Sequence, residues 1–382
     1  MERGTNRPPT NMDIPDKLAF RNRDALAAFV RDRLGWSPKR YAIAILIANL
    51  AIDISAAVVL RAFVTQSGAP GLLQDATSLL VDYLMMPAMG AFYIWSSSQI
   101  DPMLQQLYDA SVFVSSDSIN KPLQELVHAL RRGWASTVSL IVALIVALLF
   151  VGSYLDWYPW PQLISFFNHS IVLTWLKFPM WIVTIYGLSL GLYNVASTTI
   201  TLRRIFRDQS IRISPWHPDR CGGLKSISQY SLTLGYAIAV LGLTLSVQTI
   251  REIQLGTFST SYFTWFGLIA YLVLSPLAFF LPLGTAHAAM NEAKKSHLLS
   301  LSTQFDLHYK RIAEALDSEE KGIRESVQRI EALKSLYKIT EDFTIWPFDV
   351  VNLRRFLTIT LAPVIPGLFT IGSELVKVLL SD

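Results

Sequence analysis

The sequence predicts an all-α, polytopic membrane protein with about seven transmembrane helices and a cytoplasmic helical hairpin. Of its 382 residues, 52% are hydrophobic and only 16% are charged, whereas soluble domains average about 25% charged residues. The mean hydropathy of +0.37 agrees with this composition. Several nearly uncharged apolar runs also reach the roughly 20 residues that a helix needs to cross a bilayer core. A membrane is therefore the expected solvent for most of the chain.

Seven apolar runs divide the chain. Six of them form a transmembrane region over residues 41–286, and the last forms a final span and short tail over residues 356–382. None alternates apolar and polar residues with a period of two, as membrane-spanning strands do. The predicted spans are Tyr41–Val64, Leu79–Ile100, Trp134–Leu155, Ile171–Ile200, Tyr230–Ile250, Phe263–Ala286 and Phe356–Val376.

Basic residues predict the orientation of these spans. Lys and Arg concentrate in cytoplasmic loops of membrane proteins. Of the 33 Lys and Arg residues in this chain, 29 lie in the N-terminal segment and in every second connector after it. Two lie in the remaining connectors and the C-terminal tail, and Arg61 and Lys177 lie inside predicted spans. This alternation predicts a cytoplasmic N-terminus and an outside C-terminus, which requires an odd number of spans.

The leader of residues 1–40 contains an amphipathic helix. Within Leu18–Leu34, the apolar residues Leu26, Phe29, Val30 and Leu34 share one helical face, and arginines occupy the other side. Such a helix either lies at the membrane interface or docks on the cytoplasmic part of the protein.

Residues 287–355 form the one sizeable segment with a water-soluble composition. It carries eleven acidic and eleven basic residues, and its apolar residues recur at helical spacing on both sides of a turn at 317–322. This pattern predicts a helical hairpin whose first arm continues the sixth span, followed by an interfacial segment. The two apolar stripes can pair within one chain or meet those of other subunits in an oligomeric stalk.

The loop before the fifth span contains the densest unusual motif, His217-Pro218-Asp219-Arg220-Cys221-Gly222-Gly223-Leu224. Prolines fix φ and glycines admit backbone geometry closed to other residues, so the motif predicts a defined turn at a helix start. Asp219 can cap the following helix or pair with an arginine. The alternative is a catalytic or metal site, but His217, Asp219 and Cys221 supply at most three ligands.

This loop resembles one found in uncharacterised prokaryotic multi-pass membrane proteins. The residues that carry the resemblance are His217, Pro218, Asp219, Gly222, Gly223 and Leu224. The resemblance covers short patches of the chain and implies a prokaryotic inner membrane, with no activity attached to it.

Ionisable residues within spans are candidates for function, because burying them in lipid is expensive. Asp53 lies mid-span, one turn after Asn49, and is either a hydrogen-bonded core residue or part of a polar pathway. Four others lie toward the outer ends of spans, where they either snorkel or pair across helices to close a bundle. These are Arg61, Asp82, Lys177 and Glu374.

Proline and glycine also break the last predicted span. Pro363, Pro366 and Gly367 stand close together, and each proline removes a backbone donor. The segment is expected to be a gating kink, a broken helix at a binding site, or simply a kinked packing element.

These features favour an oligomeric channel- or pore-like membrane protein with a cytoplasmic helical gating or sensing element. The alternatives are a membrane-anchored interaction or signalling module, with 287–355 binding a soluble partner, and a membrane enzyme acting at the inner interface. We find no signature of a nucleotide, metal or hydrolase site and expect no cofactor. The basic inner surface suits anionic lipids rather than nucleic acid.

Overall fold

The computed structural model describes residues 24–64, 70–113, 125, 133–155, 166–208, 211–214, 217–219, 221–258, 262–315, 320–347 and 350–381. Within these ranges the chain is helical, and an isolated bridge between Phe113 and Ile211 is the one β-type pairing. The predicted all-α class is therefore confirmed. The helical elements, including the 3₁₀ and π turns (η), are α1 (Ala25–Ala28), η2 (Phe29–Arg33), α2 (Pro38–Leu60), η3 (Leu72–Gln74), α3 (Ala76–Leu80), η4 (Val81–Met85), α4 (Met86–Ser96), α5 (Ile100–Asp109), α7 (Trp134–Tyr154), η5 (Phe166–His169), α8 (Ile171–Asp208), α9 (Lys225–Gln254), α10 (Tyr262–Ala315), α11 (Glu320–Glu341), α12 (Val350–Leu361) and α13 (Ile365–Ser381).

Six helical stretches are long and apolar enough to cross a membrane, and the bent pair α12–α13 makes a seventh if it counts as one span. The first six predicted runs each match one of these stretches. The second is a composite in which α3, η4 and α4 follow one another without interruption. The protein is therefore an integral, multi-pass membrane protein.

The first span begins and ends at recognisable signals. Ser37 accepts a hydrogen bond from the Arg40 amide, and Pro38 occupies the first helical position, where its missing amide hydrogen does no harm. The helix ends at Arg61, which adopts a left-handed conformation with φ of 51°. The prediction that Arg61 lies inside this span is wrong, because it is the exposed C-terminal cap of α2.

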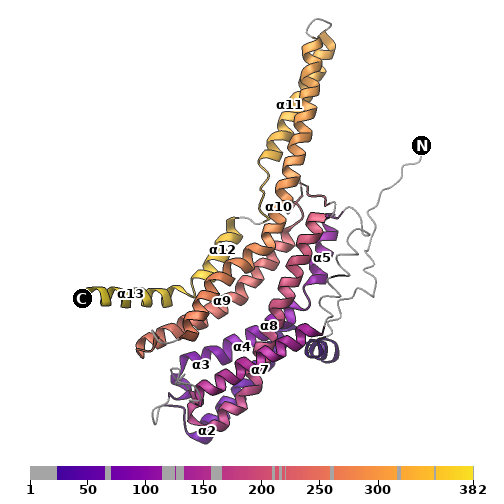
Figure 1. Ribbon diagram of the computed structural model, residues 1–382. Helices are drawn as coiled ribbons and strands as arrows, with labels where there is room; N and C mark the ends of the chain where they lie inside the picture. Colours follow the sequence, from indigo (N-terminus) through magenta and orange to yellow (C-terminus); the bar gives the residue numbers. More distant parts are fainter. Residues whose placement is uncertain are drawn as a thin grey trace.

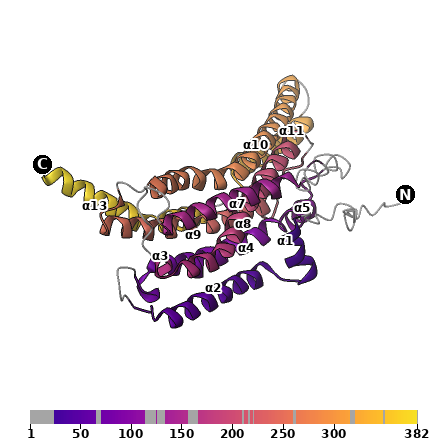
Figure 2. The same ribbon diagram turned by 60° about the horizontal axis from the view of Figure 1, so that its bottom comes forward.

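The spans pack around two apolar cores. One core joins α1, α2, α4, α7 and the first half of α8, and the other joins α5, the end of α8, α9, α10 and α12. Both α4 and α8 contribute to the two cores, and Figure 2 shows the helices lying side by side in layers from α2 to α10. Val30 and Ala27 are buried in the first core, so the described part of the leader helix docks on the bundle rather than lying free of it.

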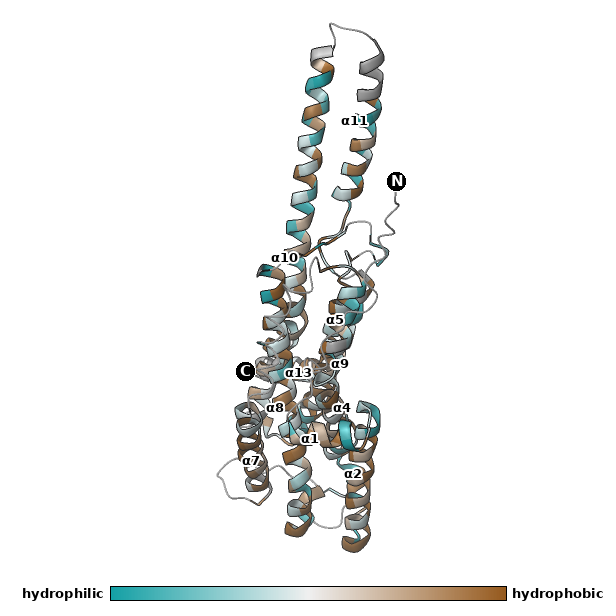
Figure 3. Ribbon diagram, turned by 90° about the vertical axis from the view of Figure 1, so that its right-hand side faces the viewer, coloured by the Kyte–Doolittle hydropathy of each residue, from teal (hydrophilic) through white to brown (hydrophobic). Residues whose placement is uncertain are grey.

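A long helical hairpin leaves one end of the bundle (Figure 1). Its first arm is α10, whose 54 residues correspond to a length of about 80 Å. The second arm, α11, pairs with α10 within the same chain. Figure 3 shows that α10 changes from mostly hydrophobic to mixed and hydrophilic as it leaves the bundle. Below, this end of the bundle is called the hairpin end and the opposite one the far end.

The chain returns from the hairpin through an anchored segment into a broken helix. Lys294 of α10 donates hydrogen bonds to the carbonyl oxygens of Glu341 and Phe343, and the His287 ring stacks on Trp346 with ring centres 4.0 Å apart. The following α12 and α13 are bent by 50° relative to each other. In Figure 1, α13 extends sideways from the bundle.

Candidate functional site

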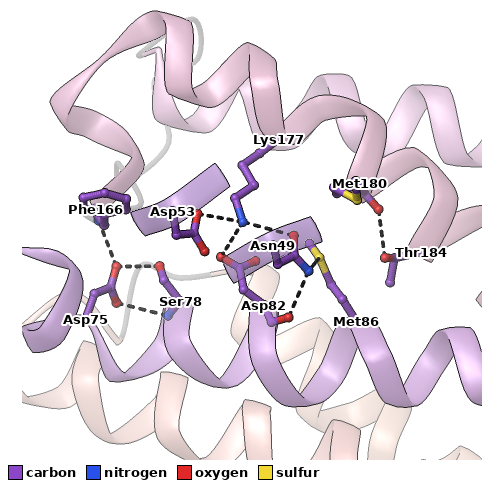
Figure 4. A network of polar contacts seen from close by, with 10 residues as sticks. All are labelled: Asn49, Asp53, Asp75, Ser78, Asp82, Met86, Phe166, Lys177, Met180 and Thr184. Atoms are coloured by element: carbon purple, nitrogen blue, oxygen red, sulfur yellow. Dashed lines mark hydrogen bonds and ion pairs between the residues drawn. The ribbon is translucent and has the colours of Figure 1, made fainter. Parts of the chain in front are cut away.

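Three spans bring ionisable side chains together at a fully buried point (Figure 4). Lys177 of α8 places its Nζ 2.8 Å from Asp53 Oδ1 of α2 and 3.1 Å from Asp82 Oδ2 of η4. The same nitrogen donates a hydrogen bond to Asn49 Oδ1 at 3.1 Å. None of these four residues is more than 1% exposed. We call Asn49, Asp53, Asp82 and Lys177 the buried cluster.

Asn49 connects the cluster to the backbone of the second span. Its Nδ2 donates to the Asp82 carbonyl oxygen at 2.9 Å and also contacts the Met86 sulfur at 3.5 Å. Because Asn49 and Asp53 are one turn apart on α2, they present their polar groups on the same side of that helix. The contacts of Asn49 and Asp53 with the second span and Lys177 give this polar side of α2 partners inside the bundle, so it is buried there.

The element that presents Asp82 is a π turn. In η4 the Met86 amide donates to the Val81 carbonyl, five residues back. Pro87 follows directly and has no amide hydrogen to give to Tyr83. A wider turn lets the helix continue past this proline without an α-helical clash. Such π turns are frequent at functional sites, and this one directs Asp82 toward Lys177.

The cluster carries unequal charge. Its ionisable groups are two carboxyl groups and one ammonium group, so full ionisation leaves one uncompensated negative charge. The Lys177 ammonium also lies 5.7 Å from the centre of the Phe167 ring, whose face favours a cation. Even a paired buried charge carries a desolvation penalty of several kcal/mol per ion. When all three groups are ionised, the cluster becomes neutral only if it binds one more cation or one proton.

A second acidic centre lies toward the far end, two turns from Asp82. Asp75 caps α3 through Ser78, pairs with Arg251 of α9 at 2.6 Å, and accepts the Phe166 amide at 2.9 Å. These bonds attach the second span to α9 and to the start of the fourth span. Because carboxylate and guanidinium are matched here, we assign this centre a structural role.

The loop motif before α9 is a turn built around one carboxylate. Asp219 accepts hydrogen bonds from the amides of Cys221, Gly223 and Lys225 at 2.8, 3.1 and 3.3 Å, and His217 Nδ1 lies 2.6 Å from its Oδ1. Burial alone raises the pKa of this carboxyl, but the amide hydrogen bonds outweigh it and lower the pKa below its usual value.

The two glycines of this motif adopt conformations that other residues rarely take. Gly222 has φ of 65° and Gly223 has φ of 94°. A Cβ on Gly223 would lie 2.7 Å from the Val112 side chain. The motif is therefore a precise backbone turn at the start of α9. Pro218 lies within the described turn, and Arg220 lies outside the described residues.

The break between α12 and α13 is attached to neighbouring spans by polar contacts. The Tyr271 hydroxyl donates to the Thr360 carbonyl at 2.6 Å, and the Gly367 amide donates to Ser246 Oγ at 2.9 Å. Pro363 and Pro366 remove the helical donors on either side of the bend. The structure therefore shows a broken helix whose released backbone groups find partners on α9 and α10.

The structure unites only some of the predicted candidates. It brings Asn49, Asp53, Asp82 and Lys177 together, whereas Arg61 is exposed at the end of α2. Glu374 lies in α13, and its side chain is outside the described part of the chain. Neither the loop motif nor the bend belongs to the cluster.

Sequence reasoning missed several buried polar groups. Asp75 and Arg251 fall in predicted loops, so neither was expected to be buried. The same holds for Glu252, which accepts a hydrogen bond from the Thr264 hydroxyl at 2.8 Å. Asp24, 5% exposed, accepts a hydrogen bond from the Tyr186 hydroxyl, and burial raises its pKa. The available signal was the residue type at a helix start, since Asp24 and Asp75 are both N-caps.

No family model, curated protein or solved structure matches the chain. What the protein does is therefore inferred from the geometry described above.

Proposed function

We propose that this membrane protein is an oligomeric channel or pore for a small cation, with the α10–α11 hairpin as its gating or sensing element. The buried cluster is the observation that carries the proposal. It places two carboxyl groups and one ammonium group on three different spans, with none of its residues more than 1% exposed.

The excess carboxyl group gives the cluster a preference for cations over anions. Selectivity in channels arises from such charged side chains held at a constriction. With all four side chains buried, the described arrangement is closed, and passage requires α2 and α8 to separate at Lys177. A residue that bridges three spans is well placed to hold such a closed state.

The hairpin supports gating because its first arm is a continuation of a span. A movement of α11 against the outer part of α10 is transmitted along one uninterrupted helix to the region where α10 packs on α9 and contacts the broken helix. Under the orientation proposed from the Lys and Arg distribution, the hairpin is cytoplasmic. The loop resemblance supports a prokaryotic inner membrane as the location, where the basic residues would face anionic lipids.

Ion flux from liposomes tests the proposal. Purified protein is reconstituted into vesicles loaded with potassium chloride, and potassium and chloride efflux are recorded for the parent protein and Asp53→Asn. We expect potassium efflux in the parent and a several-fold change in potassium flux or in the potassium-to-chloride ratio in the variant, because one acidic group of the constriction is lost while its size is kept.

Glu125→Gln is the matched control. Glu125 is half exposed and pairs with Arg204 at the surface, so its replacement removes a carboxyl group without touching the cluster and should leave flux unchanged. The absence of potassium efflux from vesicles that contain folded protein would contradict the channel proposal. Flux that is identical in Asp53→Asn would remove the cluster from the pathway.

Oligomerisation is tested separately by the mass of the protein in detergent. The chain has a mass of 42.9 kDa, and an oligomer with one pathway through the cluster of each chain requires a particle of at least two chains, after correction for bound detergent. A monodisperse single-chain particle in several detergents and in nanodiscs would reject the oligomeric part of the proposal.

The hairpin surface favours a second candidate function, a membrane-anchored interaction module. Leu299 and Tyr309 are 70% and 62% exposed on the outer part of α10, where water is the expected surroundings. A photo-crosslinker at Leu299 should then capture a discrete soluble partner in cells, while one at Leu301, two residues further and so on the other side of the helix, serves as the neighbouring control. Capture of a partner together with absent ion flux would favour this alternative.

A further inference from the structure

The protonation of the buried cluster follows from the groups that face it. From α2 come Asn49 and Asp53, from η4 come Asp82 and the half-buried Tyr83, from α8 comes Lys177, and from η5 comes the Phe167 ring. The next charged groups, Asp75 and Arg251, neutralise each other. Among the described residues, therefore, Lys177 is the one cation that compensates two carboxyl groups.

The hydrogen bonds of the cluster are incomplete in a way that one added proton would repair. Asp53 Oδ2 and Asp82 Oδ1 are buried and accept no hydrogen bond of normal geometry from the described chain. The Lys177 Nζ lies 2.8 Å from an oxygen of Asp53 and 3.1 Å from an oxygen of Asp82, and in Figure 4 both carboxyl groups point toward this one ammonium. A proton on one carboxyl group would donate to the other and remove the uncompensated charge.

We propose that the Asp53–Asp82–Lys177 cluster is a binding site for one exchangeable proton per chain, shared between the two carboxyl groups. In the uptake step a hydronium ion transfers its proton to a carboxylate, which yields a carboxylic acid and water, and no other reactant is needed. Transfer of the proton back to water reverses the step and regenerates the carboxylate and hydronium.

The effect of this proton site on conduction rests on the proposed channel function. The site itself can exist whether or not the protein conducts ions. In the protonated form the cluster is neutral and holds the three spans together. In the deprotonated form it carries one negative charge, which attracts a permeating cation and weakens the closed packing. Conduction is therefore expected to rise with increasing pH.

Infrared difference spectroscopy tests the proton site without reference to transport. The carbonyl stretch of protonated carboxylic acids is recorded at pH 7 on the full-length protein in nanodiscs, with ¹³C-labelled aspartate to identify the side chains. We expect Asp53→Asn and Asp82→Asn each to lose the intensity of one protonated carboxyl group relative to the parent. Replacing either carboxyl group removes the shared proton, because the one remaining carboxylate is then neutralised by the Lys177 ammonium.

Two further variants make the test specific. Asp75→Asn is the matched control on the same composite helix, and it should leave the intensity unchanged because Asp75 is paired with its own cation, Arg251, at 2.6 Å. Lys177→Met should add one protonated group, since both carboxyl groups then lack a cation. If this variant does not fold, the other three comparisons still decide the proposal.

Either of two results would overturn the proposal. One is unchanged acid intensity in Asp53→Asn and Asp82→Asn, which would mean that both carboxylates are ionised in the parent. The other is an intensity that responds to sodium or potassium at constant pH, which would show that a metal cation and not a proton supplies the missing charge. Absent flux with the expected spectra would contradict only the channel function and leave the proton site standing.

Discussion

At the scale of single residues, the molecule uses its buried and partly buried carboxylates in two different ways. Asp219 and Asp75 are matched by donors, the first by three backbone amides and the second by an arginine, a serine and a backbone amide. Asp53 and Asp82 share one lysine and keep unpaired oxygen atoms. The matched groups are structural, because their charge is fully compensated. The unmatched pair is where a proton or cation has something to contribute.

The matched state of Asp219 predicts a pH-dependent loss of stability. Its pKa is lowered in the folded protein, so its contribution is present above the unfolded value of about 3.9 and is lost as the pH falls through the lower folded value. Asp219→Asn should therefore destabilise the protein by about 1–3 kcal/mol at pH 7. The difference from the parent should shrink below about pH 4.

Thermal unfolding in detergent at several pH values measures this effect. His217→Ala is the companion variant, expected to retain folding because the three amide contacts of Asp219 remain. A difference between Asp219→Asn and the parent that stays constant from neutral to acid pH would show that the charge of Asp219 is irrelevant to the turn.

At the scale of elements, the spans could be read from the sequence because each is an apolar run of bilayer length. Their exact ends could not, since hydropathy continues past Arg61, where the left-handed cap stops α2, and begins only after the Asp75 cap of the second span. The bend after Leu361 was visible in its prolines. The π turn at Asp82 and the rotation of α2 against α8 were not, because both depend on side-chain packing between distant segments.

This dependence explains why the buried cluster was predicted only as a set of residues. Sequence depth places Asp82 and Lys177 at a similar level, so pairing across helices could be expected. The inclusion of Asp53 and the exclusion of Arg61 depend on where α2 ends and which way it faces. A one-residue shift in a helix turns a side chain by about 100°, which is enough to move it from the bundle to lipid.

The contacts across the α12–α13 break provide a prediction at this scale. Tyr271→Phe removes the donor to the Thr360 carbonyl and leaves that oxygen without this partner in an apolar environment, at a cost of about 1–3 kcal/mol. The melting temperature in detergent should fall by several degrees. Tyr236→Phe removes a hydroxyl from an exposed tyrosine of α9 and should leave it unchanged. Equal melting temperatures for both variants would show that the bend does not need Tyr271.

At the scale of the whole molecule, the fold and the charge distribution describe the same two ends. The hairpin, α1 and α5 lie toward one end, as do the basic C-terminal turns of α8 (Figure 2). The far end is formed by the end of α2, the start of the composite second span and the start of α10. Because Lys and Arg are concentrated in the segments of the hairpin end, that end is the one we assign to the cytoplasm.

Reporter fusions test this orientation and the nature of the bent pair together. Fusions after residues 68 and 160 should report the outside, and fusions after residues 120 and 318 should report the cytoplasm, because 29 Lys and Arg residues lie in one set of segments and two in the other. A fusion after Asp382 distinguishes two geometries of α12 and α13. If the pair crosses the membrane as one broken span, this fusion reports the outside, in agreement with seven spans. If the 50° bend turns the chain back as a re-entrant element, the C-terminus is cytoplasmic, the spans number six, and the predicted outside C-terminus is wrong.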